Sequence, residues 1–199
     1  MWPWEHVLVG YLAYSLLAHL WWRDGPSGLE AIAVAVGALL PDLVDKPLAW
    51  EFGVFQSGYA IGHSIFFALP ISLAAGVLAS RLGKLRVGVA LAVGYLLHLP
   101  GDLLYGFVQD RVLYLQTISW PFGTAPPAGD PPGFQERLTY FLSGYREELA
   151  SGDLSTYVLI QLGLAGLVVA LWLYDGAPVL RECLRALKRL GHRFLAVIG

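Results

Sequence analysis

Apolar residues in this chain are concentrated in long runs that alternate with short polar or proline-rich stretches. The runs that approach the length of a membrane span are residues 7–22, 29–43, 60–80, 87–108 and 157–174. A helix needs on the order of 20 predominantly apolar residues to cross the hydrocarbon core of a bilayer, so the first two runs need their flanking residues to do so. The pattern predicts an all-α fold, a polytopic membrane helix bundle of about five transmembrane helices.

Prolines and polar residues indicate where two of these helices begin or end. The second run is followed by two prolines and two aspartates within residues 41–47, and this combination predicts that its helix ends near residue 43. The helix of the third run, about residues 60–80, is predicted to begin near residues 62–64. Ser64 then lies in its first turn, where a hydroxyl group is expected to hydrogen-bond to the start of the helix.

Two further stretches are predicted to be amphipathic helices at the membrane interface. The first lies in the long connection after the fourth run, about residues 109–155, where apolar and charged side chains recur with helical spacing. Its apolar positions are Phe134, Leu138, Phe141, Leu142, Tyr145 and Leu149, and the opposite positions are Glu136, Arg137, Arg146 and Glu147. This helix, residues 134–149, is expected to be a lid over the bundle or an ordinary surface helix.

The second amphipathic stretch is the C-terminal one, residues 176–199. Its apolar stripe is Leu180, Cys183, Leu184, Leu187 and Phe194, and its basic residues are Arg181, Arg185, Lys188, Arg189 and Arg193. A basic amphipathic helix fits the anionic cytoplasmic leaflet of a membrane. The predicted organisation is therefore a single transmembrane helical domain over residues 1–175, with an external loop over about residues 109–155, and a basic cytoplasmic-side helix over residues 176–199.

The composition supports a membrane protein and excludes other classes. Of the 199 residues, 56% are hydrophobic and 14% are charged, and the mean hydropathy is +0.58. The formal net charge of −2 argues against a nucleic-acid partner, which would need a basic surface. The single cysteine, Cys183, allows neither an internal disulfide nor a cysteine metal cluster. The first apolar run has no basic leader and no small-residue cleavage site, so we expect it to be retained and not to act as a signal peptide.

The distribution of positive charge predicts the orientation, because cytoplasmic loops carry an excess of Lys and Arg. Arg23 lies between the first and second runs, basic residues within 81–86 lie between the third and fourth, and the basic C-terminal stretch follows the fifth. These places are on one side of a five-span bundle. We therefore expect a multi-pass protein of the cell membrane (inner or plasma membrane), surrounded by membrane lipid, with its N-terminus outside and its C-terminus cytoplasmic.

The strongest functional signal is a set of ionisable residues at one predicted depth on four different spans. His98 and Asp102 are four residues apart, so both side chains leave the same face of a helix, and such a pair inside a membrane is a functional-site hypothesis by default. The whole set, near the extracytoplasmic side, is His6, Asp42, Asp45, His63, His98 and Asp102. Imidazole and carboxylate donors suit Zn²⁺, and Mn²⁺ or Fe²⁺ is compatible with the same atoms. His19 and His192 lie away from this level, and we expect structural or solvated roles for them.

The same residues carry a resemblance to a known family. The matching features are an early His (His6), Leu-Leu-Pro-Asp-x-x-Asp (39–45), His-Ser at the start of a span (63–64), His-x-x-x-Asp (98–102) and a later Trp-Pro (120–121). Together they resemble the YdjM-like membrane-bound metal-dependent hydrolases of bacterial and archaeal inner membranes, over about residues 1–122. The Asp-Lys-Pro sequence at 45–47 is similar to archaeal members. Many members have Pro-Asp-x-Asp followed by His, whereas here Asp45 comes one residue later, which leaves open whether Asp42 or Asp45 is the closer ligand.

A more distant resemblance concerns the reaction. The order His, Asp, His, His-x-x-x-Asp on successive helices is similar to that of soluble zinc-dependent phospholipases C and related zinc nucleases, which cleave phosphoesters. It implies a phosphoester or lipid-type substrate at the extracytoplasmic side, and six donors favour one or two ions over three. The metal would activate a bound water. Its expected ligands are His6, Asp42, His63, His98 and Asp102. Asp45 would complete the coordination or act as the catalytic general base.

Two other functional classes stay open alongside the metal-dependent hydrolase. One is a non-enzymatic membrane scaffold or metal-binding protein; in a scaffold, the pairs His98–Asp102 and Asp42–His63 are hydrogen bonds that hold the bundle together. The other is a transporter, for which buried carboxylates and proline-containing helices would also serve. The small size, the absence of a visible inverted repeat and the confinement of the polar residues to one side argue against a transporter.

Overall fold

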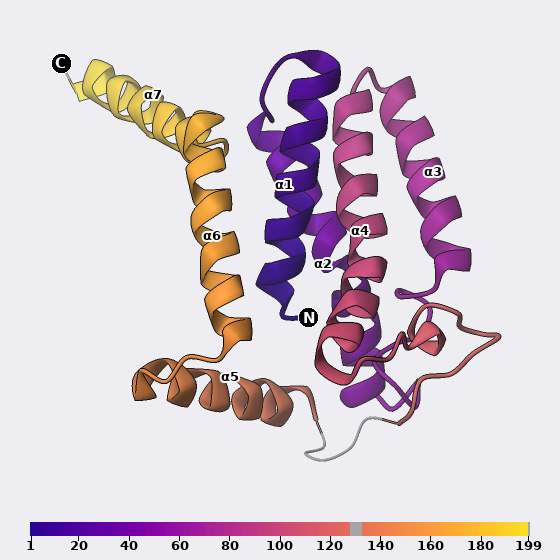
Figure 1. Ribbon diagram of the computed structural model, residues 1–199. Helices are drawn as coiled ribbons and strands as arrows, with labels where there is room; N and C mark the ends of the chain where they lie inside the picture. Colours follow the sequence, from indigo (N-terminus) through magenta and orange to yellow (C-terminus); the bar gives the residue numbers. More distant parts are fainter. Residues whose placement is uncertain (128–132, 199) are drawn as a thin grey trace.

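The computed structural model of the protein describes residues 1–127 and 133–198, with side chains described up to residue 189. Its elements are α1 (Pro3–Trp22), α2 (Gly28–Trp50), α3 (Ile65–Arg81), α4 (Leu85–Asp110), the short 3₁₀ helix η1 (Leu115–Thr117), α5 (Phe134–Ser151), α6 (Thr156–Tyr174) and α7 (Leu180–Ile198). The described residues contain no strand, so the all-α prediction is confirmed (Figure 1). The side chains of His192, Arg193 and Phe194, which belong to the predicted basic stretch, lie outside the described part.

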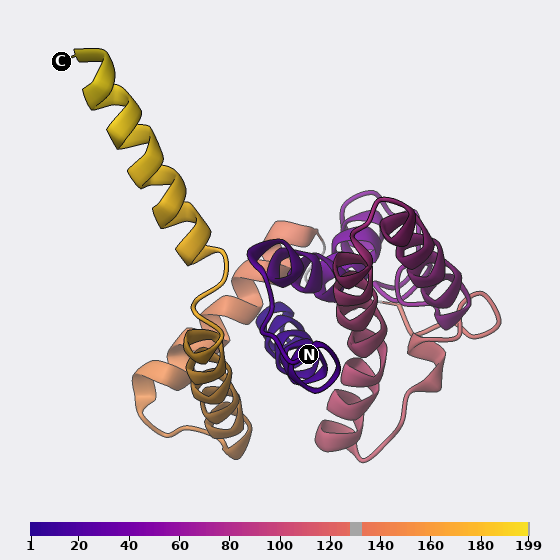
Figure 2. The same ribbon diagram turned by 90° about the horizontal axis from the view of Figure 1, so that it is seen from above.

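The helices α1 to α4 form a bundle in which α4 contacts all of the other three (Figures 1 and 2). The four helices alternate in direction, so the start of α1, the end of α2, the start of α3 and the end of α4 lie at one end (Figure 1). We call this the N-terminal end of the bundle. Tyr14, Val34 and Ala90 belong to a buried apolar cluster at the packing of α1, α2 and α4.

Two glycines allow α2 and α4 to touch backbone to backbone. A Cβ atom on Gly37 of α2 would lie 2.2 Å from a backbone oxygen of α4, and one on Gly94 of α4 would lie 2.2 Å from a backbone oxygen of α2. No side chain fits at such a distance, so glycine is required at both positions for this close crossing. The crossing lies about one helical turn from Asp42 and His98, and it therefore sets how closely these two side chains approach.

α6 lies beside α1 and is fastened to it near both ends. At one end the Tyr157 hydroxyl lies 2.7 and 2.6 Å from the two carboxylate oxygens of Glu5. At the other end the Asp175 carboxylate accepts hydrogen bonds from two hydroxyl groups of α1 and pairs with His19 at 2.7 Å. α5 lies below the start of α6 and contacts the bundle through α2 (Figure 1), and α7 leads away from the bundle (Figure 2).

Among the described residues, α4 and α6 are long and apolar enough to cross a membrane, and α3 is a shorter apolar helix. The exposed faces of α3 and α6 are apolar: Leu73 and Leu78 are 69% and 60% exposed, and Ile160 and Leu167 are 61% and 57% exposed. Apolar surfaces of this extent suit lipid surroundings. The number of spans, about five, stays a prediction.

One predicted helix boundary was wrong, and one agrees closely with the structure. α2 does not end near residue 43 but continues through both prolines to Trp50; a proline removes only one helical hydrogen bond, and contacts with neighbouring segments can support the helix beyond it. α3 begins at Ile65, directly after the predicted start near residues 62–64. Backbone N–H groups of residues 60, 62 and 63 donate hydrogen bonds to the Asp45 carboxylate, which holds the preceding stretch in a loop.

Candidate metal centre

Three histidines and two aspartates meet at the N-terminal end of the bundle. His6 comes from α1, Asp42 from α2, His63 from the loop before α3, and His98 and Asp102 from α4. Each is buried, with at most 8% of its surface exposed. Two groups of these residues have donor atoms that all lie within 4.8 Å of one another, which is close enough to hold a metal ion. The groups are Asp42, His63 and His98, and His6, His98 and Asp102.

His63 is oriented by Asp45. The Nδ1 atom of His63 lies 2.8 Å from Asp45 Oδ2, and the backbone N–H groups of Ala60, Gly62 and His63 donate to the same carboxylate at 2.7 to 3.0 Å. A carboxylate accepts, so the proton of the neutral imidazole is on Nδ1. The Nε2 atom of His63 therefore carries a lone pair, and this atom faces the other residues of the centre.

His98 is oriented in the same manner by a backbone group of α2. Its Nδ1 atom lies 2.7 Å from the carbonyl oxygen of Ala38. A carbonyl oxygen can only accept a hydrogen bond, so Nδ1 of His98 carries the proton and Nε2 carries a lone pair. The close glycine crossing of α2 and α4 places this carbonyl within reach of the ring.

The two free imidazole nitrogens face each other. The Nε2 atoms of His63 and His98 are 3.1 Å apart, and Asp42 Oδ1 lies 3.3 Å from the first and 3.7 Å from the second. Two ligands of a tetrahedral zinc ion, each about 2.0–2.1 Å from the metal, lie roughly 3.3 Å apart. The spacing of these three donor atoms therefore matches three ligands of one zinc-sized cation.

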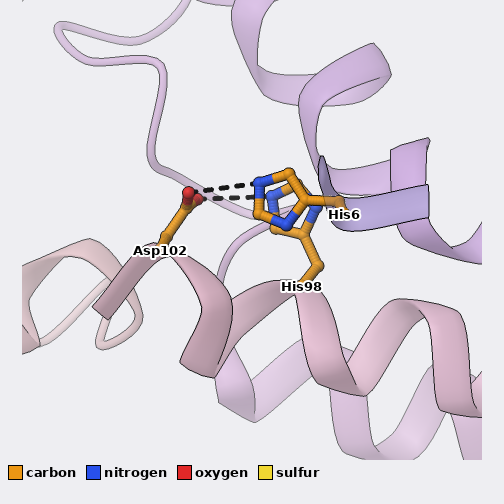
Figure 3. A group of neighbouring side chains, drawn as sticks. All are labelled: His6, His98 and Asp102. Atoms are coloured by element: carbon orange, nitrogen blue, oxygen red, sulfur yellow. Dashed lines mark ion pairs between the residues drawn. The ribbon is translucent and has the colours of Figure 1, made fainter. Parts of the chain in front are cut away.

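His6 and Asp102 form the other side of the centre (Figure 3). The His6 ring stacks on the His98 ring with 3.6 Å between centroids, and its Nε2 atom lies 3.2 Å from Asp102 Oδ1. The second oxygen of Asp102 lies 3.3 Å from His98 Nε2 and 3.5 Å from His63 Nε2. Because His98 has only one nitrogen free, a single ion can bind through it, and a second ion would depend on His6 and Asp102.

Several donor atoms of the centre have no hydrogen-bond partner among the described residues. These atoms are His6 Nε2 and both carboxylate oxygens of Asp42, and all three are buried. Lys46 Nζ lies 2.7 Å from Asp42 Oδ1, an ion-pair distance without hydrogen-bond geometry. Buried polar atoms are normally satisfied, so unpaired imidazole and carboxylate atoms that converge fit a bound cation. The residues present therefore suit a divalent metal such as zinc.

The other polar residues highlighted by the sequence lie elsewhere. Asp45 lies behind His63 and belongs to neither donor group. His19 pairs with Asp175 and is also outside both groups. Ser64 precedes α3 but does not cap it, so that prediction was wrong; its hydroxyl donates instead to the carbonyl oxygen of Trp120. This contact ties the 120–121 segment to the loop that carries His63.

Lys46 is a residue of the site that sequence reasoning missed. It follows Asp42 by four residues on α2, which places the two side chains on one face of the helix. The spacing was the signal that could have found it. Because the sequence predicts that this helix ends near residue 43, it does not predict that Lys46 and Asp42 share a helical face.

The fold and the site together define a class, that of helical membrane proteins with a buried His/Asp centre at one end of the bundle. Within this class the chain belongs to the YdjM inner membrane protein family, whose model matches residues 1–178. The match includes every residue of the centre and also α5 and α6, so it extends beyond the resemblance seen in residues 1–122. Comparisons with curated proteins and with solved structures gave no match. The family description states a location in the inner membrane and no reaction.

Proposed function

We propose that this protein is an integral-membrane metal-dependent hydrolase that holds zinc in its His/Asp centre and acts on a phosphoester or lipid-type substrate. The observation that carries the proposal is the pair of facing imidazole nitrogens. In their neutral forms His63 and His98 point two lone pairs at each other across 3.1 Å. Two acceptors repel at this distance, whereas a cation between them turns both into ligands.

Each residue of the His/Asp centre has a defined part in this proposal. Asp42, His63 and His98 bind one ion, which would lower the pKa of a bound water and polarise a phosphoryl oxygen. His6, whose ring stacks on the His98 ring, would accept a proton on Nε2, and Asp102 Oδ1 would stabilise that proton from 3.2 Å. With a second ion, His6 and Asp102 would be its ligands.

Asp45 has a positioning part in this proposal. Its carboxylate already accepts three backbone hydrogen bonds and the His63 Nδ1–H bond. These four hydrogen bonds occupy both oxygens of the carboxylate. The hydrogen bonds therefore favour orientation of His63 over general-base catalysis, since partners of this kind fix the ring and raise its basicity as a ligand.

The extracytoplasmic side is the proposed location of the centre. Arg23 and the basic residues of 81–86 lie at the opposite end of the bundle from His6 and Asp102, because α1 and α3 end there and α4 begins there (Figure 1). Under the positive-inside rule that opposite end is cytoplasmic. A substrate would then reach the centre from the outer leaflet or from the extracytoplasmic solvent.

The test is metal analysis by mass spectrometry on protein purified in detergent without chelator. We expect about one or two equivalents of zinc in the wild type and a loss of most of it in His98→Ala and in Asp42→Asn. His19→Ala is the matched control, because this histidine is also paired with a carboxylate but lies outside both donor groups. Retention of zinc by the His19 variant, together with loss in the other two, would justify screens for phosphoester and lipid hydrolysis.

A scaffold without metal is the second candidate, and the same two rings favour it. If one ring is protonated, His63 and His98 can share the proton across 3.1 Å and hold α4 to the loop before α3. A well-folded wild type that carries no metal, and takes up none on addition of zinc or manganese, would support this scaffold. Metal without hydrolysis of any tested ester would indicate a metal-binding protein.

A further inference from the structure

A cavity of about 280 Å³ adjoins the His/Asp centre, and α5 forms one of its walls. Lys46 and Trp50 of α2, Tyr59 of the loop before α3 and Tyr105 of α4 line it from the bundle, and Arg137 lines it from α5. Helix α5 was expected from the sequence to be either a lid or an ordinary surface helix. Its contact with α2 and its share in this cavity favour the lid.

Two of the lining residues also contact the centre. Lys46 Nζ lies 2.7 Å from Asp42 Oδ1, and the Tyr59 ring meets the His63 ring edge to face at 4.8 Å between centroids. A molecule in the cavity would therefore lie next to the residues that are proposed to hold the metal. The cavity is in the position of a substrate subsite and not of a separate site.

Arg137 is the unexpected residue of this cavity. The spacing of apolar residues predicted that it faces solvent, but it is only 8% exposed, and its guanidinium lies over the Trp50 ring at 5.2 Å. Its Nε atom is buried without a hydrogen-bond partner, and no carboxylate of the described residues lies within ion-pair distance. Burial of an arginine without an anion is unfavourable, so an anionic partner would stabilise this side chain.

The other polar groups of the cavity are also donors. Trp50 has a buried Nε1–H without a partner among the described residues. Tyr59 also lines the cavity, and its phenol O–H can donate a hydrogen bond. None of the described residues that line the cavity carries a carboxylate. Arg137, which has no ion pair among the described residues, together with Lys46, which is paired with Asp42, and the neutral donors form a lining that suits an oxyanion.

We propose that this cavity binds a phosphate group of the substrate, with Arg137 and Lys46 as its cationic partners. The proposal rests on the proposed function, and it narrows the substrate class to phosphate esters that carry a negative charge next to the scissile bond. A volume of about 280 Å³ accommodates a phosphate-bearing headgroup and not a pair of acyl chains. Two apolar side chains of α5, Leu138 and Phe141, also line the cavity.

The experiment is a calorimetric titration of the purified full chain in detergent with inorganic phosphate. Arg137→Gln removes the buried charge, and Arg137→Lys keeps it without the planar fork. Arg146→Gln is the matched control, since it lies on the exposed face of the same helix. We expect Arg137→Gln to weaken phosphate binding by about 10–100-fold, Arg137→Lys to weaken it less, and Arg146→Gln to match the wild type. Equal affinity in wild type and Arg137→Gln, or equal losses in the Arg137 and Arg146 variants, would overturn the proposal.

A competition arm distinguishes a lipid headgroup from a water-soluble ester. Phosphatidic acid in mixed micelles is added before the titration, with phosphatidylcholine at the same concentration as the reference. If phosphatidic acid competes with inorganic phosphate in the wild type and phosphatidylcholine does not, the phosphate comes from a lipid with an exposed monoester. If neither competes while the Arg137 dependence holds, the subsite serves a water-soluble phosphate ester.

Metal analysis of the same samples keeps the two proposals separate. If the wild type and Arg137→Gln both contain zinc and bind phosphate equally well, the proposed phosphate subsite is wrong and the proposed hydrolase is unaffected. No zinc in any sample, with phosphate binding that depends on Arg137, would overturn the hydrolase and leave the anion site. The melting temperature of each variant in the same detergent excludes unfolding as the cause of a lost signal.

Discussion

The Nε2 atoms of His63 and His98 lie 3.1 Å apart, although hydrogen bonds at the other nitrogen of each ring leave both as acceptors. A cation must lie between two such atoms, and it is either a metal ion or a proton. The two differ in one respect that can be measured: a chelator removes a metal and has no effect on a shared proton. The response of the protein to a chelator therefore distinguishes a metal centre from a hydrogen-bonded scaffold.

Chelation is expected to destabilise the wild-type protein. An ion that binds only the folded state at 100 times its dissociation constant contributes about 2.7 kcal/mol, so EDTA should lower the melting temperature in detergent by roughly 5–10 °C. Readdition of zinc should restore it. His98→Gln should show no response to either treatment, whereas His19→Gln should respond as the wild type does. An unchanged melting temperature of the wild type after complete chelation would contradict the metal centre.

Replacement of Asp45 is expected to affect both stability and metal binding. Asp45→Ala leaves three backbone N–H groups and the Nδ1–H of His63 buried without an acceptor. The loss of a buried charged partner costs about 3–5 kcal/mol of unfolding free energy, and loss of a carboxylate behind a metal-binding histidine weakens metal affinity by about 10–100-fold. Thermal unfolding and metal titration measure the two effects. Asp153→Ala, an exposed aspartate after α5, should change neither.

The residues of the centre could be predicted because ionisable side chains inside apolar runs are costly and therefore conspicuous. The sequence could not tell Asp42 from Asp45, since three residues along a helix place both on similar faces. The difference comes from the loop before α3, whose backbone N–H groups surround Asp45 and leave Asp42 Oδ1 beside the imidazole nitrogens. Loop conformation of this kind has no periodic signal in a sequence.

The same reasoning explains why Arg137 was missed. Periodicity along α5 records which positions are apolar, and by that measure Arg137 belongs to the polar face. Its burial depends on Trp50, a residue of another helix far away in sequence, which stacks against the guanidinium. The two prolines of α2 lead to the prediction that this helix ends before Trp50, whereas it continues to that residue. A single error in the end of one helix therefore hid Lys46, Trp50 and the cavity together.

The polar cluster at the opposite end of α1 is expected to act on stability alone. Asp175 accepts hydrogen bonds from Tyr11 and Ser15 and pairs with His19, each at 2.7 Å, and so fastens α6 to α1. Asp175→Ala should lower the unfolding free energy by about 2–4 kcal/mol because buried Tyr11 and Ser15 and half-buried His19 lose their acceptor. Metal content by mass spectrometry should equal that of the wild type. Loss of metal in this folded variant would mean that the two ends of the bundle are coupled, contrary to the separate roles proposed here.

The glycine crossing of α2 and α4 is expected to control metal affinity without contributing a ligand. In Gly94→Ala the new Cβ would lie 2.2 Å from a backbone oxygen of α2, so the two helices must move apart. Overpacking of this kind costs about 1–3 kcal/mol. The separation would also lengthen the hydrogen bond from His98 Nδ1 to the Ala38 carbonyl, which holds the ring in position. We therefore expect zinc affinity to fall at least about tenfold, by analogy with the loss of other groups that orient a metal ligand.

Gly163→Ala is the control for this substitution, because a Cβ at Gly163 of α6 meets nothing within 4 Å. Alanine is favoured over glycine in a helix by about 0.8–1.0 kcal/mol, so this variant should be as stable as the wild type or more stable, with unchanged zinc affinity. Unfolding in detergent and zinc titration on both variants complete the comparison. If Gly94→Ala loses stability but keeps its zinc affinity, the position of His98 as a ligand does not depend on the crossing of α2 and α4. Only a joint loss of stability and affinity agrees with a centre whose geometry is set by the contact between these two helices.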